Sequence, residues 1–313
     1  DCLAAALEWS GHDVTREFYV NDAGNQINKF GASLSVRYLQ LFEGEEKHPL
    51  PEDCYQGMDI LDHAREFAKL YGDKYVNAPE EERRKALVDY ALPLNIAALE
   101  RDLGRYRIHY DVWFRESVLH REGKVTAICE KLKENGWAYE KEGALWYNNI
   151  KMMIEKAEKA GKPLSEAEIA ELKDDVLVRA NGVPTYFAAD IAYHYNKFAE
   201  RGFHRVINIW GADHHGHVAR LKGAMDAVGL DGDKLDIVLM QLVRLMKDGQ
   251  PYRMSKRSGR AVTLTDLLDD VPIDAARFFF NMREPNATFD FDLDLAVRED
   301  SENPVYYVQY AHA

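Results

Sequence analysis

Apolar and polar residues follow two different spacings along the chain, and each spacing predicts a different kind of element. In the first half, helical spacing dominates and apolar runs of strand length are short. The elements predicted up to residue 148 are a helix at 2–10, a strand at 13–20, a helix at 26–42, charged helices over 55–103, a strand at 106–114, a helix at 124–135 and a strand at 137–147. The block at 55–146 is interpreted as an inserted α/β subdomain.

The second half alternates regularly between strands and helices. The predicted elements are a strand at 176–179, a helix at 185–201, a strand at 205–210, a helix at 215–228 and a strand at 235–242. This alternation predicts parallel βαβ units in a Rossmann-like, doubly wound sheet of the α/β class. Ligands of such sheets bind at the carboxyl ends of the strands.

A charged segment at 150–174 separates the two halves. Gly161 and Pro163 break it into two helical runs, and Ser165 with Glu168 forms the pattern of a capping box at the start of the second run. We predict a helical hairpin on the surface.

Composition limits the class of protein. The chain has 313 residues, of which 46% are apolar, so it can form a full core. Its net charge is -13. Cys2, Cys54 and Cys129 are too far apart for a zinc ribbon and are typical of reduced thiols. Since the sequence contains neither a signal-peptide pattern nor a long apolar run, we expect a soluble cytoplasmic protein without a membrane segment.

One loop concentrates positive charge on this acidic chain. Its four cations are Arg253, Lys256, Arg257 and Arg260. The small residues among them would let backbone amides approach a ligand: Ser255, Ser258 and Gly259. Phosphate is the leading candidate, and a solvated hairpin is the alternative. Thr265 is expected to cap the helix that follows.

A second cluster follows the strand predicted at 205–210, at the sheet edge where ligands bind. It contains Asp213, His214, His215 and His217, with Gly211 and Gly216 allowing close backbone approach. Asp213 and His217 have the spacing of one helical face, so zinc ligation is one interpretation. Structural histidines are a second, and contacts to a nucleotide are a third.

Tyr186 and Asp190 lie one turn apart at the start of the helix predicted at 185–201. A carboxylate can select a guanidinium over an ammonium by a charge-assisted, bidentate pair. The alternative is a carboxylate that serves the helix dipole beside a tyrosine in the core.

Seven segments in order resemble those of bacterial arginyl-tRNA synthetases, which are class I aminoacyl-tRNA synthetases. They are YVNDAGNQI (19–27), DVWFRES (111–117), EKEGALW (140–146), DDVLVRANGVPTYFAADIAYH (174–194), GADHHGH (211–217), RMSKRSG (253–259) and ENPVYYVQYAHA (302–313). RMSKRSG resembles the KMSKS signature, with Arg253 where the family usually has lysine. The resemblance covers nearly the whole chain and departs from it mainly at 150–172.

The resemblance implies a role for each candidate residue. Tyr186 and Asp190 would bind arginine, while Gly211, Asp213, His214 and His217 would line the adenosine site. Met254, Ser255 and Lys256 would form the catalytic signature loop on the triphosphate of ATP. The implied reaction forms arginyl adenylate from arginine and ATP with Mg²⁺ and then charges tRNA(Arg), with no structural metal and a monomeric enzyme.

The resemblance also implies an organisation. Residues 1–54 and 147–313 would form the catalytic core and 55–146 its connective insertion. The sequence contains no HIGH tetrapeptide, the family's other signature. We expect a core truncated at both ends, without that turn, the N-terminal tRNA-elbow domain or the anticodon-binding domain, and with little or no activity alone.

Two other functions stay open at this point. A metal-dependent hydrolase would be centred on Asp213, His214 and His217. A noncatalytic nucleotide- or tRNA-binding paralogue would explain the missing HIGH turn.

Overall fold

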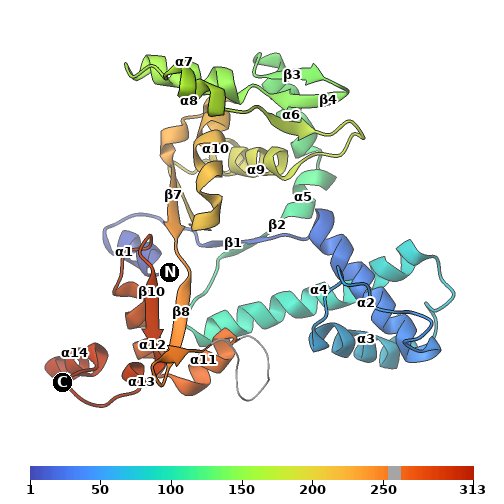
Figure 1. Ribbon diagram of the computed structural model, residues 1–313, viewed down its shortest axis with the longest axis vertical. Helices are drawn as coiled ribbons and strands as arrows, with labels where there is room; N and C mark the ends of the chain where they lie inside the picture. Colours follow the sequence, from blue (N-terminus) through green and yellow to red (C-terminus); the bar gives the residue numbers. More distant parts are fainter. Residues whose placement is uncertain (253–261) are drawn as a thin grey trace. The chain divides into compact units, whose positions relative to one another are not determined.

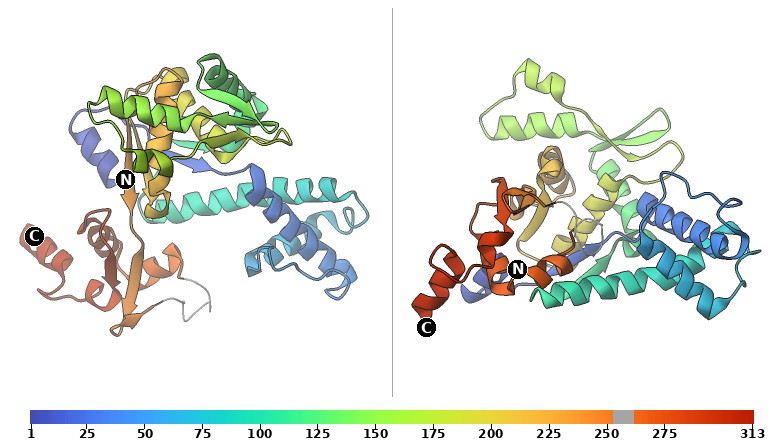
Figure 2. Two further views of the ribbon diagram at one scale, coloured as in Figure 1. Left: turned by 45° about the horizontal axis from the view of Figure 1, so that its top comes forward. Right: turned by 60° about the horizontal axis from the view of Figure 1, so that its bottom comes forward.

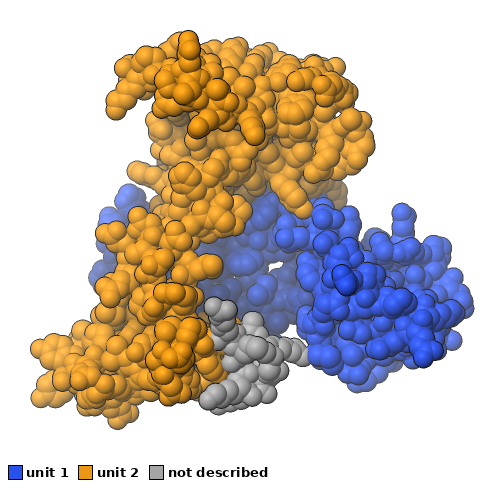
Figure 3. Space-filling model, viewed as in Figure 1, with its two compact units in different colours: residues 1–117 blue, residues 118–313 orange. Residues whose placement is uncertain are grey.

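The computed structural model describes residues 1–252 and 262–313 (Figure 1). The chain forms two compact units, residues 1–117 and 118–313, which are coloured separately in Figure 3. Each unit has its own strands and buried core, so each is described by itself.

The first unit is mainly helical. Its elements are α1 (Cys2–Trp9), β1 (Glu17–Val20), α2 (Gly24–Glu43), α3 (Met58–Tyr71), α4 (Glu80–Arg105) and β2 (Val112–Arg115), and α5 (Glu116–Arg121) runs across the unit boundary. Strands β1 and β2 pair in parallel, which requires a long crossover. Helices α2, α3 and α4 form this crossover and appear as one group in both views of Figure 2.

An apolar core holds these three helices together. The amphipathic pattern of α2 places Leu34 and Tyr38 against Phe67 of α3 and Leu87 of α4, and all four side chains are almost completely buried. Pro79 occupies the N-cap position of α4, directly before three glutamates in the first turn, where their charges favour the helix dipole. The strand β1 from the predicted core pairs with β2 from the predicted insertion, and the domain division stays a prediction.

The second unit contains the alternating half of the chain. Its elements are α6 (Lys124–Glu134), β3 (Ala138–Lys141), β4 (Ala144–Tyr147), α7 (Asn149–Lys159), α8 (Glu166–Glu171), β5 (Asp175–Val178), α9 (Tyr186–Tyr195), a π-helix (Asn196–Glu200), β6 (Val206–Gly211), a 3₁₀ turn (Ala212–His214), α10 (His215–Ala227), a second 3₁₀ turn (Gly232–Lys234), β7 (Leu235–Met240), β8 (Val243–Lys247), β9 (Gln250–Pro251), α11 (Leu264–Asp270), α12 (Ile273–Asn281), β10 (Phe289–Asp292), α13 (Leu293–Ala296) and α14 (Pro304–His312).

Strand pairing in this unit is parallel in two places. Strands β6 and β7 pair in parallel across the α10 crossover, as predicted, and β10 pairs in parallel with β8. Strand β5 differs from the prediction, because it pairs antiparallel with β4 in a meander of β3, β4 and β5. The expectation that residues 176–179 open a parallel βαβ unit is therefore wrong. A short apolar run does not reveal the direction of its partner.

Two predicted helix starts have different outcomes. The capping box of Ser165 and Glu168 forms at the start of α8. Thr265 is not a cap, because Thr263 accepts from the Asp266 backbone N–H and Asp266 bonds back to Thr263. The spacing of three residues from Thr263 to Asp266 completes a capping box that Thr265 lacks.

Candidate active site

The first turn of α9 is fixed to β5 through its N-cap. The Thr185 hydroxyl donates to the Val176 carbonyl at 2.7 Å and accepts from the Ala188 amide at 3.5 Å. This anchor sets the position of Tyr186 and Asp190 one turn apart on α9. Tyr186 is 49% exposed and the Asp190 carboxylate is 31% exposed, so both can meet a ligand.

The segment after β6 turns at a glycine. A Cβ on Gly211 would lie 2.4 Å from Asp213 Oδ1, so any larger residue here would require the exposed Asp213 carboxylate to move. Asp213 lies in the 3₁₀ turn, whereas His217 lies on α10. The predicted helical face shared by Asp213 and His217 therefore does not form.

His217 instead meets the predicted arginine site. Its Nε2 lies 2.9 Å from Asp190 Oδ2, which joins α10 to α9. The rings of Phe187 and Trp210 flank the imidazole, with ring centroids 5.4 and 5.5 Å away. His217, predicted at the adenosine site, thus holds the carboxylate predicted to bind arginine.

A second charged pair borders this cluster. The Arg220 guanidinium bonds to the Asp175 carboxylate and also donates from Nε to the Gly216 carbonyl at 3.0 Å. Burial raises the pKa of Asp175, and Arg220 partly offsets that shift. The Phe187 ring contacts both Arg220 and the His217 imidazole. Phe187 therefore lies between the Arg220–Asp175 pair and the His217–Asp190 pair.

Asp213 and His214 are the most exposed members of the set. Their side chains are 81% and 58% exposed, and His214 Nε2 lies 3.7 Å from Asp213 Oδ2. Over residues 1–252 and 262–313, no three His, Cys, Asp or Glu side chains gather in a group that could hold a metal ion. This geometry offers Asp213 and His214 to a polar ligand.

Two buried residues behind Asp190 were not predicted from the sequence. His194 Nδ1 lies 2.7 Å from the Asp190 carbonyl, and His194 Nε2 lies 2.6 Å from Asn208 Nδ2 on β6. The spacing of four residues between Asp190 and His194 was the available signal, because side chains at that spacing share a helical face.

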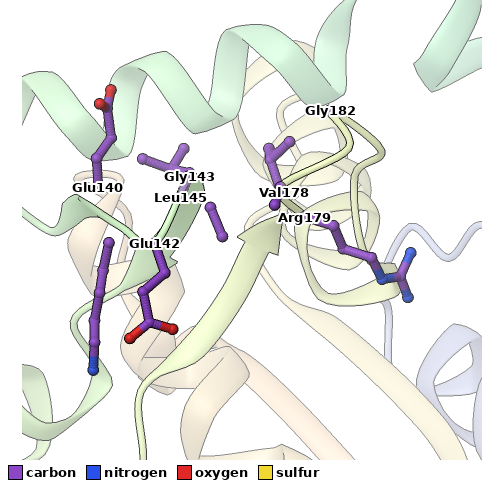
Figure 4. Close-up of a pocket in the computed structure, with 10 residues that line it drawn as sticks. Glu140, Glu142, Gly143, Leu145, Val178, Arg179 and Gly182 are labelled. Carbon is purple, nitrogen blue, oxygen red and sulfur yellow. The ribbon is translucent and has the colours of Figure 1, made fainter.

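The predicted signature loop lies outside the described residues, with Met254, Ser255 and Lys256. An open cavity of about 370 Å³ is described elsewhere in this unit, at the β3–β4 turn and the end of β5 (Figure 4). Leu145 and Val178 line it, together with Glu142, while Arg179 points away from them. None of the predicted site residues within 1–252 and 262–313 lines this cavity.

Comparison with known proteins shows the family of this chain. Residues 1–293 match the family model of class I tRNA synthetases (R), catalytic domain. The chain belongs to this family, which confirms the predicted family and α/β fold class.

Individual relatives point the same way. The chain is 54% identical over its 313 residues to the arginine–tRNA ligase of Ruminiclostridium cellulolyticum and 56% identical to that of Caldanaerobacter subterraneus. It covers 52% of each relative, so it spans about half the length of the curated relatives it matches.

Solved structures support the fold. A crystal structure assigned as an arginyl-tRNA synthetase of Campylobacter jejuni matches 98% of this chain and 62% of its own, with a TM-score of 0.83 and 34% identity. The Thermus thermophilus arginyl-tRNA synthetase matches the whole chain and 58% of its own, with a TM-score of 0.69 and 20% identity, and so supports the fold alone.

The family does not favour the alternative of a metal-dependent hydrolase. Among the described helices, none is both long and apolar enough to cross a membrane.

Proposed function

We propose that this chain is the catalytic core of an arginine–tRNA ligase. The observation that carries the proposal is the Asp190 carboxylate, which is partly exposed on α9 and held at Oδ2 by His217. The family membership and the arginine–tRNA ligases among its relatives support the same substrate.

Asp190 would select arginine by charge and shape. His217 fixes the side chain through Oδ2, which leaves Oδ1 and a second lone pair on Oδ2 for two parallel N–H donors. A guanidinium provides such a planar pair of donors and an ammonium does not. Tyr186, one turn away and half-exposed, would add its hydroxyl to the same ligand.

ATP would bind at the carboxyl end of β6. Beside Gly211, Asp213 and His214 present exposed polar groups for adenosine. His217 completes this edge while it holds Asp190. Lys256, with Met254 and Ser255, would bind the triphosphate, which enters as its Mg²⁺ complex.

The reaction needs no covalent bond to the protein. The arginine carboxylate attacks the α-phosphorus, and the bond to the β-phosphate oxygen breaks, giving arginyl adenylate and pyrophosphate. A ribose hydroxyl at the 3′ end of tRNA(Arg) then attacks the activated carbonyl and releases AMP. The protein's contribution is positioning and charge stabilisation. We further propose a cytoplasmic, monomeric enzyme.

Amino acid-dependent exchange of pyrophosphate into ATP tests the proposal. The protein at its natural full length is assayed with tRNA(Arg) and with arginine, lysine, citrulline and glutamine in turn. Exchange that depends on arginine is expected. Citrulline is the matched control, since it keeps the shape of arginine but lacks its charge. Exchange with another amino acid and not with arginine would refute the proposal.

A further inference from the structure

His194 is a buried histidine that meets the site through the main chain of Asp190. Only 2% of the residue is exposed. It bridges two elements: its Nδ1 lies 2.7 Å from the Asp190 carbonyl on α9, and its Nε2 lies 2.6 Å from Asn208 Nδ2 on β6. The imidazole therefore links the main chain of Asp190 to the strand that ends at Gly211.

Lys197 determines which atom of the Asn208 side-chain amide faces His194. Lys197 Nζ donates to Asn208 Oδ1 at 3.4 Å, so the Asn208 amide group presents its Nδ2–H to His194. An imidazole nitrogen facing an N–H must accept, which leaves the proton on Nδ1. His194 Nδ1–H then donates to the Asp190 carbonyl.

The surroundings keep His194 neutral in this tautomer. Burial lowers its pKa to about 4, and the charge of Lys197 acts in the same direction. The bonds to the Asp190 carbonyl and to Asn208 act in the opposite direction and are outweighed.

The helix that carries His194 changes its hydrogen-bond pattern just after this residue. The α-helix α9 ends at Tyr195, and a π-helix (Asn196–Glu200) follows, so helical register is not continuous at this point. A buried bond from His194 to Asn208 fixes the register of α9 on β6 just before the change. Asp190 lies on α9, and the segment leading to His217 continues from β6.

We propose that His194 is a positioning residue of the arginine site, which sets Asp190 against the end of β6 through the Asp190 carbonyl and Asn208. This inference rests on the proposed function. It assigns His194 no contact with substrate. Its role is to hold the carboxylate where one guanidinium reaches it without displacing His217.

Two variants and one control test this role in the pyrophosphate exchange assay. His194→Phe keeps the ring and removes both hydrogen bonds, and we expect KM for arginine to rise about tenfold while KM for ATP changes little. His194→Asn can still donate to the carbonyl four residues back, so a smaller rise is expected. Ile191→Val is the control, since Ile191 is fully buried on α9 without a polar contact, and its KM values should stay unchanged. A folded His194→Phe protein with an unchanged KM for arginine overturns the inference.

The tautomer provides a test that does not require a variant to fold. Nitrogen NMR of histidine-labelled protein at pH 7 should show His194 neutral and protonated at Nδ1. A neutral ring protonated at Nε2 overturns the inference, whatever the kinetics. Failure of arginine to support exchange in the wild-type protein would instead refute the proposed function, because the tautomer does not depend on it.

Discussion

The two units each bury a polar network, and the two networks end in different places. In the first unit, Arg83 is 8% exposed and donates to Ser35 Oγ at 2.8 Å and to the Ala78 carbonyl at 3.0 Å. In the second, His194 joins Asn208 to the carbonyl of Asp190, whose carboxylate is exposed. The network of Arg83 ends inside the scaffold, whereas that of His194 leads to a group that a ligand can reach.

This difference separates stability from function. Both networks satisfy buried polar groups, which folding requires. The bonds of Arg83 tie α4 to α2 and to the turn before α4, so their loss should lower stability. The bonds of His194 fix one residue of a site, so their loss should also change substrate binding.

The largest effect is expected for Arg83→Met. The change keeps an apolar stem but leaves Ser35 and the Ala78 carbonyl without the guanidinium, which should lower the free energy of unfolding by about 4 kcal/mol. Urea denaturation followed by hydrogen exchange in α2 and α4 measures it. Lys85→Met is the control, because Lys85 is exposed and forms an exposed ion pair with Asp89 at 2.5 Å, and it should cost less than about 0.5 kcal/mol. Equal losses in the two variants would contradict the scaffold role.

The next effect is a dependence of stability on pH in α9. His194 has a pKa of about 4 in the fold and about 6.5 in the unfolded chain, so between these values the unfolded state binds the proton first. Stability should therefore fall as pH drops from 6.5 to 4, by at most about 3 kcal/mol. Hydrogen exchange of α9 amides, compared between wild type and His194→Phe, isolates this contribution. Identical pH slopes in the two proteins would show that His194 is not kept neutral.

A smaller effect distinguishes two buried tyrosines. The Tyr38 hydroxyl donates to the Gly72 carbonyl at 2.6 Å, whereas the Tyr147 hydroxyl has no hydrogen-bond partner within the described part of the chain. Tyr38→Phe should cost about 1 kcal/mol of unfolding free energy, and Tyr147→Phe should be neutral or slightly stabilising. Thermal unfolding of the pair measures the difference. A larger loss at Tyr147 would mean that its hydroxyl is satisfied in solution.

Much of the fold was predictable because local pattern dominates it. The start of α10 follows from helical spacing, the end of α7 from the break at Gly161 and Pro163, and the start of α8 from its capping box. The direction of β5 was not predictable, since its partner β4 is distant in sequence and a short apolar run fits either direction.

The sequence predicted which segments carry the candidate site, but it did not predict the contacts between their side chains. Sequence placed Asp190 at the start of a helix and His217 after a strand, and both positions are confirmed. The contact between them depends on how α9 and α10 pack, which no local pattern encodes. The role of His194 was not predicted for a related reason, because its partner Asn208 becomes a neighbour only when β6 packs against α9.

The central claim is that the Asp190 carboxylate, held by His217, binds the arginine guanidinium. Its most direct test is KM for arginine in Asp190→Ala, with Asp233→Ala as control, since Asp233 is 82% exposed and forms a long ion pair with Lys156 at 3.9 Å. Loss of a charged hydrogen-bond pair of about 1.5 to 3 kcal/mol predicts a rise in KM of roughly 10- to 100-fold, with KM for ATP little changed. An Asp190→Ala protein that keeps the wild-type KM for arginine would contradict the account.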